Sequence, residues 1–337
     1  MKGNLRVGNS IGNGTMTISF LTISSRSVMT VLVVTLFTIV PEFSSALANT
    51  DANADGKAAP ARIVSLVPAL TETLFALGVG DRVVGVSDFC DEPAAARLLP
   101  RVGTFVAPVA EAVLALNPDL VLTSPTPGNQ SAVGALKRAG VRIGVVGGDA
   151  SIQEVRRSIL RTAALVGAQA EGQELLAAMT ADLDWVRAAA APEPRPLVAL
   201  VIGSDPLVLA GASSYLGELL ELAGAENLGA KLEGRWPRVG MEFLVSESPA
   251  VLIDVSTPME SEGGAQAART SWERFPSLRA VADQRIHVLK ASVLLRPGPR
   301  LGSAARRLFE VIHPEAALAL KPEGDGSTAA GVFAPNN

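Results

Sequence analysis

The feature that most constrains the fold is an alternation of strand-length apolar runs with helical patterns, interrupted once in the middle of the chain. The alternation runs through residues 62–147, and a second stretch of the same kind begins at residue 197. Strands that alternate with helices are typical of an α/β sheet whose strands run mainly parallel. The sequence therefore predicts an α/β protein with two similar lobes.

The interruption between the two stretches is helical. Ser151 and Glu154 have the spacing of a capping box, and Gly167 is placed to end the helix that they open. A second helical pattern then runs from Gln169 to about Ala191, which corresponds to roughly 30 Å of helix. We expect a single long backbone helix to join the lobes, with a ligand cleft between them.

The N-terminal region has the pattern of an export signal. Residues 28–40 form an uncharged apolar run, basic residues precede it, and Ala46-Leu47-Ala48 follows. A secretory signal needs an apolar stretch of roughly 7 to 15 residues, whereas a transmembrane helix needs roughly 20. We predict cleavage after Ala48 and a periplasmic protein. An uncleaved membrane anchor and a start at Met16 remain alternatives.

The chain is thus divided as follows. The predicted segments are a signal peptide (1–48), a flexible N-terminal tail (49–60), an N-terminal lobe (61–150), a helical segment that includes the backbone helix (151–191), a C-terminal lobe (192–314) and a flexible C-terminal tail (315–337). The tails are rich in small and polar residues, which cannot bury enough apolar surface to fold.

The two lobes share a short internal repeat. Glu111 lies seven residues before Pro118, and Glu242 lies seven residues before Pro249. In both lobes the segment has the pattern of a short helix, a proline that stops it and a buried strand. The two glutamates are therefore predicted to occupy equivalent positions.

Charge and motifs exclude several functions. The chain has 29 basic and 33 acidic side chains, so it offers no basic surface for nucleic acid. Two histidines and the single Cys90 cannot build a histidine-rich metal site, and we predict none. Phosphate-binding glycine loops and a nucleophile elbow are missing, so we expect no catalytic residues and no enzyme activity. A secreted hydrolase is kept as a less favoured alternative.

Several segments together resemble a known class of proteins. They are RIVSLVPALTETLFALG with DRVVGVSDFCDEP, LPRVGTF with AEAVLALNPDLVL, ENLGAKLEGRWPRVGMEFLVSESPAVLI, and LLRPGPRL. The set, which spans residues 62–313, is similar to ABC-transporter periplasmic substrate-binding proteins of the helical-backbone class, the receptors for cobalamin, siderophores and haem. It is most similar to the cobalamin-binding subgroup.

The resemblance implies roles for individual residues. Glu111 and Glu242 match docking glutamates that pair with arginines of an inner-membrane permease dimer. Phe89, Phe105 and Trp236 match aromatic residues of the ligand cleft, and Arg296 lies in the loop before the last helix. The resemblance implies a monomer that holds no cofactor of its own and that captures cobalamin or a related corrinoid for import.

The sequence also departs from the class at two places. Glu92 stands where haem-binding relatives often have an axial tyrosine, and Ser292 and Val293 stand where some cobalamin binders have Asp and Trp. A ferric siderophore or haem is therefore the alternative ligand.

Overall fold

The computed structural model describes residues 58–256 and 264–320. The chain divides into two units, Met1–Ala48 and Asn49–Asn337, and all described residues belong to the second. The predicted signal peptide and its cleavage site lie outside the described residues. Within the described ranges, every helix is too short or too polar to cross a membrane.

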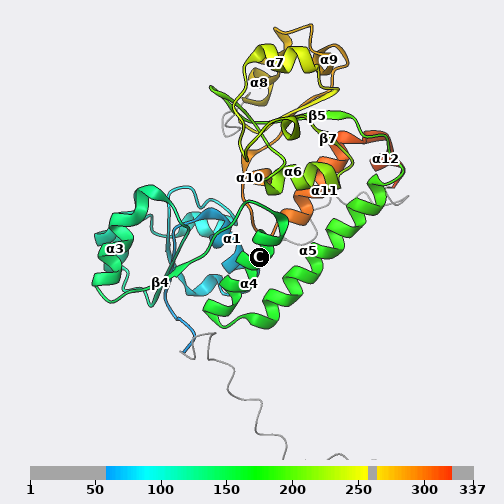
Figure 1. Ribbon diagram of the computed structural model, residues 1–337. Helices are drawn as coiled ribbons and strands as arrows, with labels where there is room; N and C mark the ends of the chain where they lie inside the picture. Colours follow the sequence, from blue (N-terminus) through cyan, green and yellow to red (C-terminus); the bar gives the residue numbers. More distant parts are fainter. Residues whose placement is uncertain (1–57, 257–263, 321–337) are drawn as a thin grey trace, which may run out of the picture. The chain divides into compact units, whose positions relative to one another are not determined.

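The N-terminal lobe, blue to green in Figure 1, is built on a parallel sheet. Its strand order is β2-β1-β3-β4. Its strands are β1 (Ile63–Ser65), β2 (Val83–Val86), β3 (Leu120–Thr123) and β4 (Arg142–Val145). Its helices are α1 (Pro68–Ala76), α2 (Ala110–Ala115) and α3 (Gln130–Arg138), and 3-10 turns lie at Gly80–Arg82, Ala94–Leu98 and Pro127–Asn129.

Both faces of this sheet are buried, which explains its continuous apolar strands. Successive side chains of a strand point to opposite faces. Ile63 and Leu120 pack with α1, whereas Val64 and Val121 pack with α2 and α3. The central strands therefore have apolar residues on both faces.

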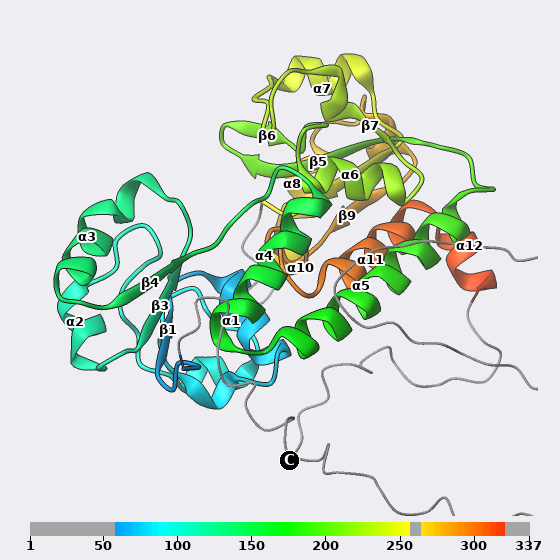
Figure 2. The same ribbon diagram turned by 60° about the horizontal axis from the view of Figure 1, so that its bottom comes forward.

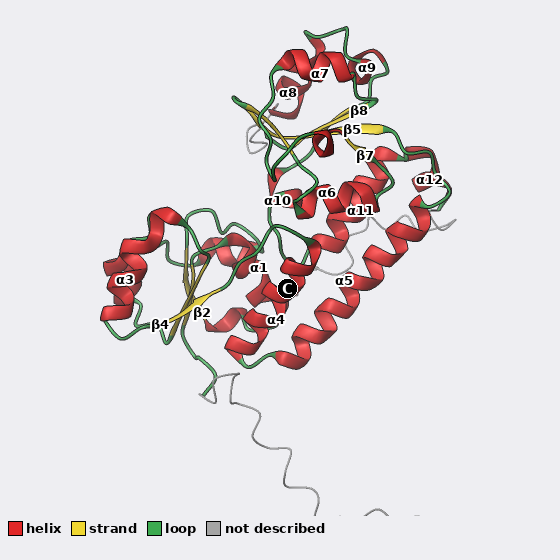
Figure 3. Cartoon of the chain, in the orientation of Figure 1, coloured by secondary structure: helices red, strands yellow, loops and turns green. Residues whose placement is uncertain are grey.

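The C-terminal lobe repeats this design (Figure 3). Its strands are β5 (Leu197–Ser204), β6 (Leu207–Leu209), β7 (Glu226–Asn227), β8 (Val251–Asp254) and β9 (Ile286–Val288). Its helices are α6 (Tyr215–Leu222), α7 (Met241–Glu247), α8 (Gly264–Glu273), α9 (Arg279–Ala282), α10 (Ala291–Leu294) and α11 (Leu301–Ile312), with a 3-10 turn at Leu228–Lys231. Strands β7, β5, β8 and β9 pair in parallel, and β6 joins β5 antiparallel.

The predicted internal repeat is confirmed by this topology. The order β7-β5-β8-β9 matches β2-β1-β3-β4, so α2 and α7 are equivalent helices that each lead into a central strand. The residues before the two prolines, Asn117 and Ser248, both adopt left-handed backbone, with φ of 46° and 45°. This unusual conformation recurs at matching positions in the two lobes.

Two helices carry the chain from one lobe to the other, α4 (Ile152–Val166) and α5 (Gln169–Ala190). Ser151 caps α4 by accepting a 3.1 Å hydrogen bond from the Glu154 amide, and Gly167 ends it with φ of 76°. Both signals are as the sequence predicts. The long α5 lies beside α4, and Figure 2 shows the two together.

The joining helices belong to both hydrophobic cores. Val155 and Ile159 of α4 pack in the core of the C-terminal lobe, whereas Ala163 and Val166 pack in that of the N-terminal lobe. Leu175 of α5 contacts both cores. The connection is therefore a shared structural layer.

The last helix corrects the predicted C-terminal tail. Residues 315–337 are predicted to be flexible, but α12 (Pro314–Ala319) occupies the start of this segment. Proline is well suited to the first turn of a helix because its missing amide needs no partner there. Residues 321–337 lie outside the described part of the chain.

Candidate functional site

Two predicted ligand-binding residues form a ring pair in the N-terminal lobe. Phe89 follows β2 and its side chain is 54% exposed. Its ring meets that of Phe105 edge to face, with centroids 6.2 Å apart and an interplanar angle of 66°. Such geometry is favourable for aromatic pairs. Exposure of a large ring is costly in water, so this pair is a candidate surface for an apolar ligand.

Asn129 fixes the position of Phe105. Its Nδ2 donates to the Phe105 carbonyl oxygen at 3.3 Å and to Thr123 Oγ1 at 3.1 Å, and Asn129 is buried. Thr123 is the last residue of β3, so the ring pair is anchored at the carboxyl edge of the parallel sheet. Ligands of open α/β sheets bind at this edge.

A cavity of about 510 Å³ opens beside this anchor. It is lined by the ends of β3 and β4, by the segment between β3 and α3 and by one face of α3, namely Thr123, Ser124, Pro125, Thr126, Pro127, Asn129, Gln130, Val133, Gly134, Lys137 and Val145. Asn129 is common to the cavity and to the ring pair. We did not predict these residues from the sequence, although the polar and proline-rich segment 123–129 follows directly after a buried strand.

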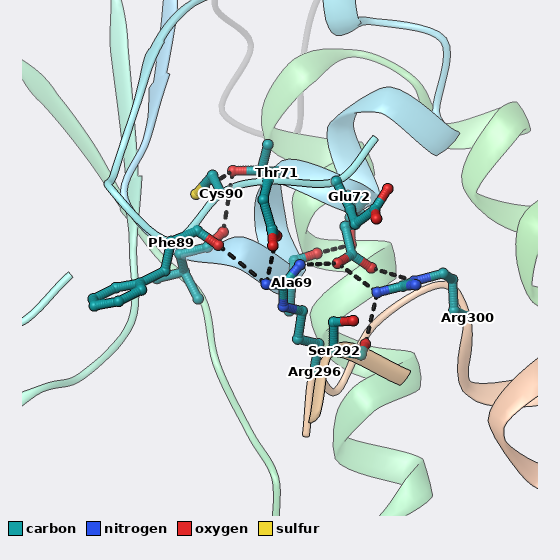
Figure 4. Close-up of polar contacts among 12 residues, drawn as sticks. Ala69, Thr71, Glu72, Phe89, Cys90, Ser292, Arg296 and Arg300 are labelled. Carbon is teal, nitrogen blue, oxygen red and sulfur yellow. Dashed lines mark hydrogen bonds and ion pairs between the residues drawn. The ribbon is translucent and has the colours of Figure 1, made fainter. Parts of the chain in front are cut away.

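Arg296, the third predicted ligand-binding residue, lies in a buried ion cluster. Its Nη1 donates to Glu72 Oε1 at 3.0 Å, and Glu72, on α1, is only 4% exposed. Arg300 donates two hydrogen bonds to the same carboxylate, from Nε and from Nη2, both at 2.8 Å (Figure 4). Arg296 thus joins the C-terminal lobe to the N-terminal lobe.

The second nitrogen of the Arg296 guanidinium reaches the loop of the ring pair. Nη2 lies 2.5 Å from Asp91 Oδ1 and donates to the Phe89 carbonyl oxygen at 3.2 Å. Burial alone would lower the pKa of Arg296, but its contacts with Glu72 and Asp91 outweigh burial and raise it. The structure thus brings Phe89, Phe105 and Arg296 together. Glu72 was not predicted, because in the sequence it is only a lone acid in an apolar helix.

Trp236 lies in a different environment. It is half-buried and packs against the core of the C-terminal lobe, in a loop held by backbone hydrogen bonds from Gly211 to Arg235 and from Leu209 to Pro237. The Arg235 side chain pairs with Asp149 at 2.5 Å. Asp149 lies two residues before Ser151, the N-cap of α4. None of the contacts among the described residues joins Trp236 to the ring pair.

Glu111 and Glu242 have the same local setting. Each is the second residue of its helix, in α2 and α7, and each side chain is exposed. A carboxylate in the first turn is favoured by the helix dipole, so it can remain charged and uncovered there. The docking role of the two glutamates stays a prediction.

Three side chains that could ligate iron, those of Tyr215, His313 and Cys90, are buried and bonded within the fold. Tyr215, the only tyrosine, is buried and donates to the Leu294 carbonyl oxygen at 2.6 Å, and burial raises its pKa strongly. His313 is 6% exposed and bonds to the Ala223 carbonyl oxygen at 3.1 Å. Burial, followed by repulsion from Arg285, lowers the pKa of His287 to about 4.

Cys90 is fully buried, within 3.1 Å of Thr71 Oγ1 and 3.2 Å of Ser87 Oγ. Among the described residues, no group of three His, Cys, Asp or Glu could hold a metal ion.

Comparisons with known proteins agree with this architecture. An uncharacterised ABC transporter substrate-binding lipoprotein of Bacillus subtilis (strain 168), YvrC, is 30% identical over 77% of this chain and 82% of its own. The apo periplasmic heme-binding protein RhuT of Roseiflexus sp. RS-1 superposes with a TM-score of 0.68 and 28% identity, covering 76% of this chain and 98% of that one. The periplasmic vitamin B12-binding protein BtuF of Vibrio cholerae gives 0.64 and 25%, covering 75% and 96%.

The family model described as "Periplasmic binding protein" matches residues 63–293, from the first strand of the N-terminal lobe to helix α10. This range contains both sheets and the joining helices. The chain therefore belongs to the periplasmic binding protein family.

Proposed function

We propose that this protein is the soluble receptor of an ABC importer and that it captures cobalamin or a related corrinoid. The observation that carries the ligand class is the ring pair of the exposed Phe89 and the half-buried Phe105 at the carboxyl edge of the N-terminal sheet. Flat rings pack on a large macrocycle at little entropic cost, because each has only two side-chain torsions to order.

The need of haem iron for an axial protein ligand favours a corrinoid over haem. Haem iron in proteins is commonly held by an axial His, Tyr, Cys or Met. Here Tyr215, His313 and Cys90 are buried and bonded within the fold, and His287 lies inside β9. A corrinoid carries its cobalt with ligands already in place and needs no such donor. The relatives and structural neighbours include vitamin B12-binding proteins as well as heme-binding ones.

Haem is the second candidate ligand, because two heme-binding neighbours are at least as similar to this chain in sequence as the vitamin B12-binding protein of Vibrio cholerae, which is 25% identical. The Roseiflexus protein is 28% identical to this chain, and a heme-binding protein named BhuT, solved with two hemes, is 30% identical. A ferric siderophore is the third candidate.

The partner is proposed from the repeated glutamates. A two-fold permease presents the same basic pocket twice, and Glu111 and Glu242 present the same exposed carboxylate twice. The curated relative from B. subtilis is named an ABC transporter substrate-binding lipoprotein. In this chain the single cysteine is buried at position 90, so we propose export by a cleaved signal peptide without lipid attachment.

The test is a calorimetric titration of residues 49–337 with cyanocobalamin, cobinamide and haemin. We expect submicromolar corrinoid binding, which Phe89→Ala weakens about tenfold through lost ring contact. Leu318→Ala is the matched control, because Leu318 is an exposed apolar residue of α12, far along the chain from the ring pair. Binding of haemin alone would keep the transport class and replace the ligand.

A further inference from the structure

Ion pairs cross between the lobes at two places, and each place lies beside a candidate ligand-binding residue. At the first place Glu72 of α1 binds Arg296 and Arg300, which lie between α10 and α11 and at the start of α11. At the same place Asp91 also pairs with Arg296. Asp149, before α4, binds Arg235, the neighbour of Trp236. We propose that Glu72 is a positioning residue, which holds the Phe89 loop in place through Arg296 and so makes the ligand face depend on a contact between the lobes.

Burial distinguishes the Glu72 contacts from the Asp149 pair. The side chains of Glu72, Arg296 and Arg300 are 4%, 15% and 24% exposed, whereas those of Asp149 and Arg235 are 39% and 41% exposed. Water and salt screen exposed pairs, which contribute little. Removal of one partner from a buried pair leaves an uncompensated charge and is far more costly. The Glu72 contact is therefore the one that can hold the lobes.

A single side chain, that of Arg296, connects Glu72 with the backbone of Phe89. Arg296 contacts Glu72 through Nη1 and the Phe89 carbonyl oxygen through Nη2. The guanidinium is planar and rigid, so these two contacts fix each other's position. Figure 4 shows the Phe89 ring directed away from the guanidinium, which leaves the ring free to meet a ligand.

Further contacts seat the arginine loop on α1. Arg300 Nη2 also donates to the Ser292 carbonyl oxygen at 2.7 Å, which ties α10 to the cluster. Gly298, between the two arginines, lies so close to Ala69 that a Cβ there would be 3.3 Å from the Ala69 carbonyl oxygen. A shift of one lobe relative to the other therefore has to break the Glu72 contact or move the Phe89 backbone.

This inference rests on the proposed function only for its ligand readout. A face that is already in its binding geometry loses less entropy on binding, and its affinity is higher. Loss of the Glu72 contact should therefore weaken binding although Phe89, Phe105 and Arg296 are all retained.

The main test uses the charge-balanced variant Glu72→Gln/Arg300→Gln. It removes one negative and one positive charge and leaves Arg296 paired with Asp91, so the fold keeps its compensated charges. The single variant Glu72→Gln removes the carboxylate partner of Arg300, while Arg296 keeps Asp91, and it serves as a secondary comparison. Asp149→Asn, which removes the exposed pair between the lobes, is the matched control.

The first readout needs no ligand. Spin labels at the exposed positions Ser131→Cys in α3 and Ser277→Cys after α8 report the distance between the lobes by pulsed electron paramagnetic resonance. Hydrogen exchange reports the loop 87–93. The balanced variant is expected to broaden the distance distribution and to speed exchange in the loop, whereas Asp149→Asn leaves both unchanged. Cyanocobalamin affinity is expected to fall about tenfold.

Unchanged distances and exchange in the balanced variant would overturn the proposal, even if its melting temperature falls. Equal loosening by Asp149→Asn would also overturn it. If wild-type protein binds neither cyanocobalamin nor haemin, both proposed ligands are excluded, but the ligand-free distances still decide the role of Glu72.

Discussion

His287 is an imidazole in β9 whose buried Nε2 has no hydrogen-bond partner among the described residues. Burial, aided by Arg285, Arg269 and Arg307, lowers its pKa to about 4. In the unfolded chain the pKa is near 6.5, so below that pH the unfolded state binds the proton and the folded state does not. The free energy of unfolding is therefore unaffected by His287 above pH 6.5, and protonation of His287 in the unfolded state lowers it as the pH falls toward 4.

We expect His287→Leu to reduce this acid sensitivity. The wild-type free energy of unfolding should drop by about 2 kcal/mol more than that of the variant between pH 7.5 and 4.5. Urea denaturation at the two pH values measures the difference. His313→Leu is a less informative control, because His313 also has a lowered pKa and loses a hydrogen bond. Equal pH dependence of the wild type and His287→Leu would show that His287 titrates normally.

Glu111 and Glu242 give a second prediction at the residue scale. Each single change to Ala should leave ligand affinity and melting temperature unchanged, and should reduce ligand-stimulated ATP hydrolysis by the permease. Glu171→Ala is the control, because Glu171 is likewise an exposed acid in the first turn of a helix, α5. If Glu171→Ala lowers hydrolysis equally, the effect is one of general charge and not of docking.

Single residues divide into those that sequence reasoning can find and those it cannot. The motif that surrounds Phe89 and Phe105 predicts both as ligand-binding residues, and this role stays a prediction, although the structure brings their rings into contact. Glu72 was not identifiable, because its two partners lie more than 220 residues away along the chain. A pairing of that kind depends on how the lobes meet, which no local pattern encodes.

Among the elements, α5 and α11 make an unusually close approach at Gly302. A Cβ at Gly302 would lie 2.6 Å from Asp182 Cβ, well inside contact distance. Beyond this point Arg306 pairs with Asp182 at 2.7 Å and stacks 4.1 Å from the centre of the Trp185 ring. The absence of a side chain at Gly302 therefore allows α5 and α11 to pack this closely.

Gly302→Ala should destabilise the protein by about 1–3 kcal/mol, although alanine favours helix more than glycine does. Gly134→Ala in α3 is the matched control. Its new methyl group would meet only the flexible end of Arg138, at 3.5 Å, so a gain of up to about 1 kcal/mol is expected. Thermal unfolding of both variants gives the comparison, and stabilisation in both would contradict close packing at Gly302.

The elements themselves were largely predictable. Ser151 and Gly167 bound α4 as their residue types require, and α5 ends at Ala190, one residue from the predicted end. The short strand β7 and the antiparallel β6 were not predicted, because two or three residues carry no periodic signal. Helix α12 was missed because its segment is rich in alanine and close to a polar end of the chain.

For the whole molecule, the shared core positions of α4 and α5 predict how it unfolds. Leu175 packs against the cores of both lobes, so neither core can be exposed without loss of contacts in the other. Differential scanning calorimetry of residues 49–337 should show one transition, whose calorimetric and van't Hoff enthalpies agree. Leu175→Ala should lower the melting temperature without splitting the peak. Two separate transitions in the wild type would contradict the shared layer.

The layer formed by α4 and α5 also makes the two lobes depend on each other. Two matching halves are the pattern expected of an ancestral gene duplication, yet the first half now ends in helices that complete the second. Residues 61–150 taken alone would lack Ala163 and Val166 of α4, which share a core with Leu120 and Leu122. Because both cores share the joining helices, a substitution in the α4–α5 layer is felt in both halves at once.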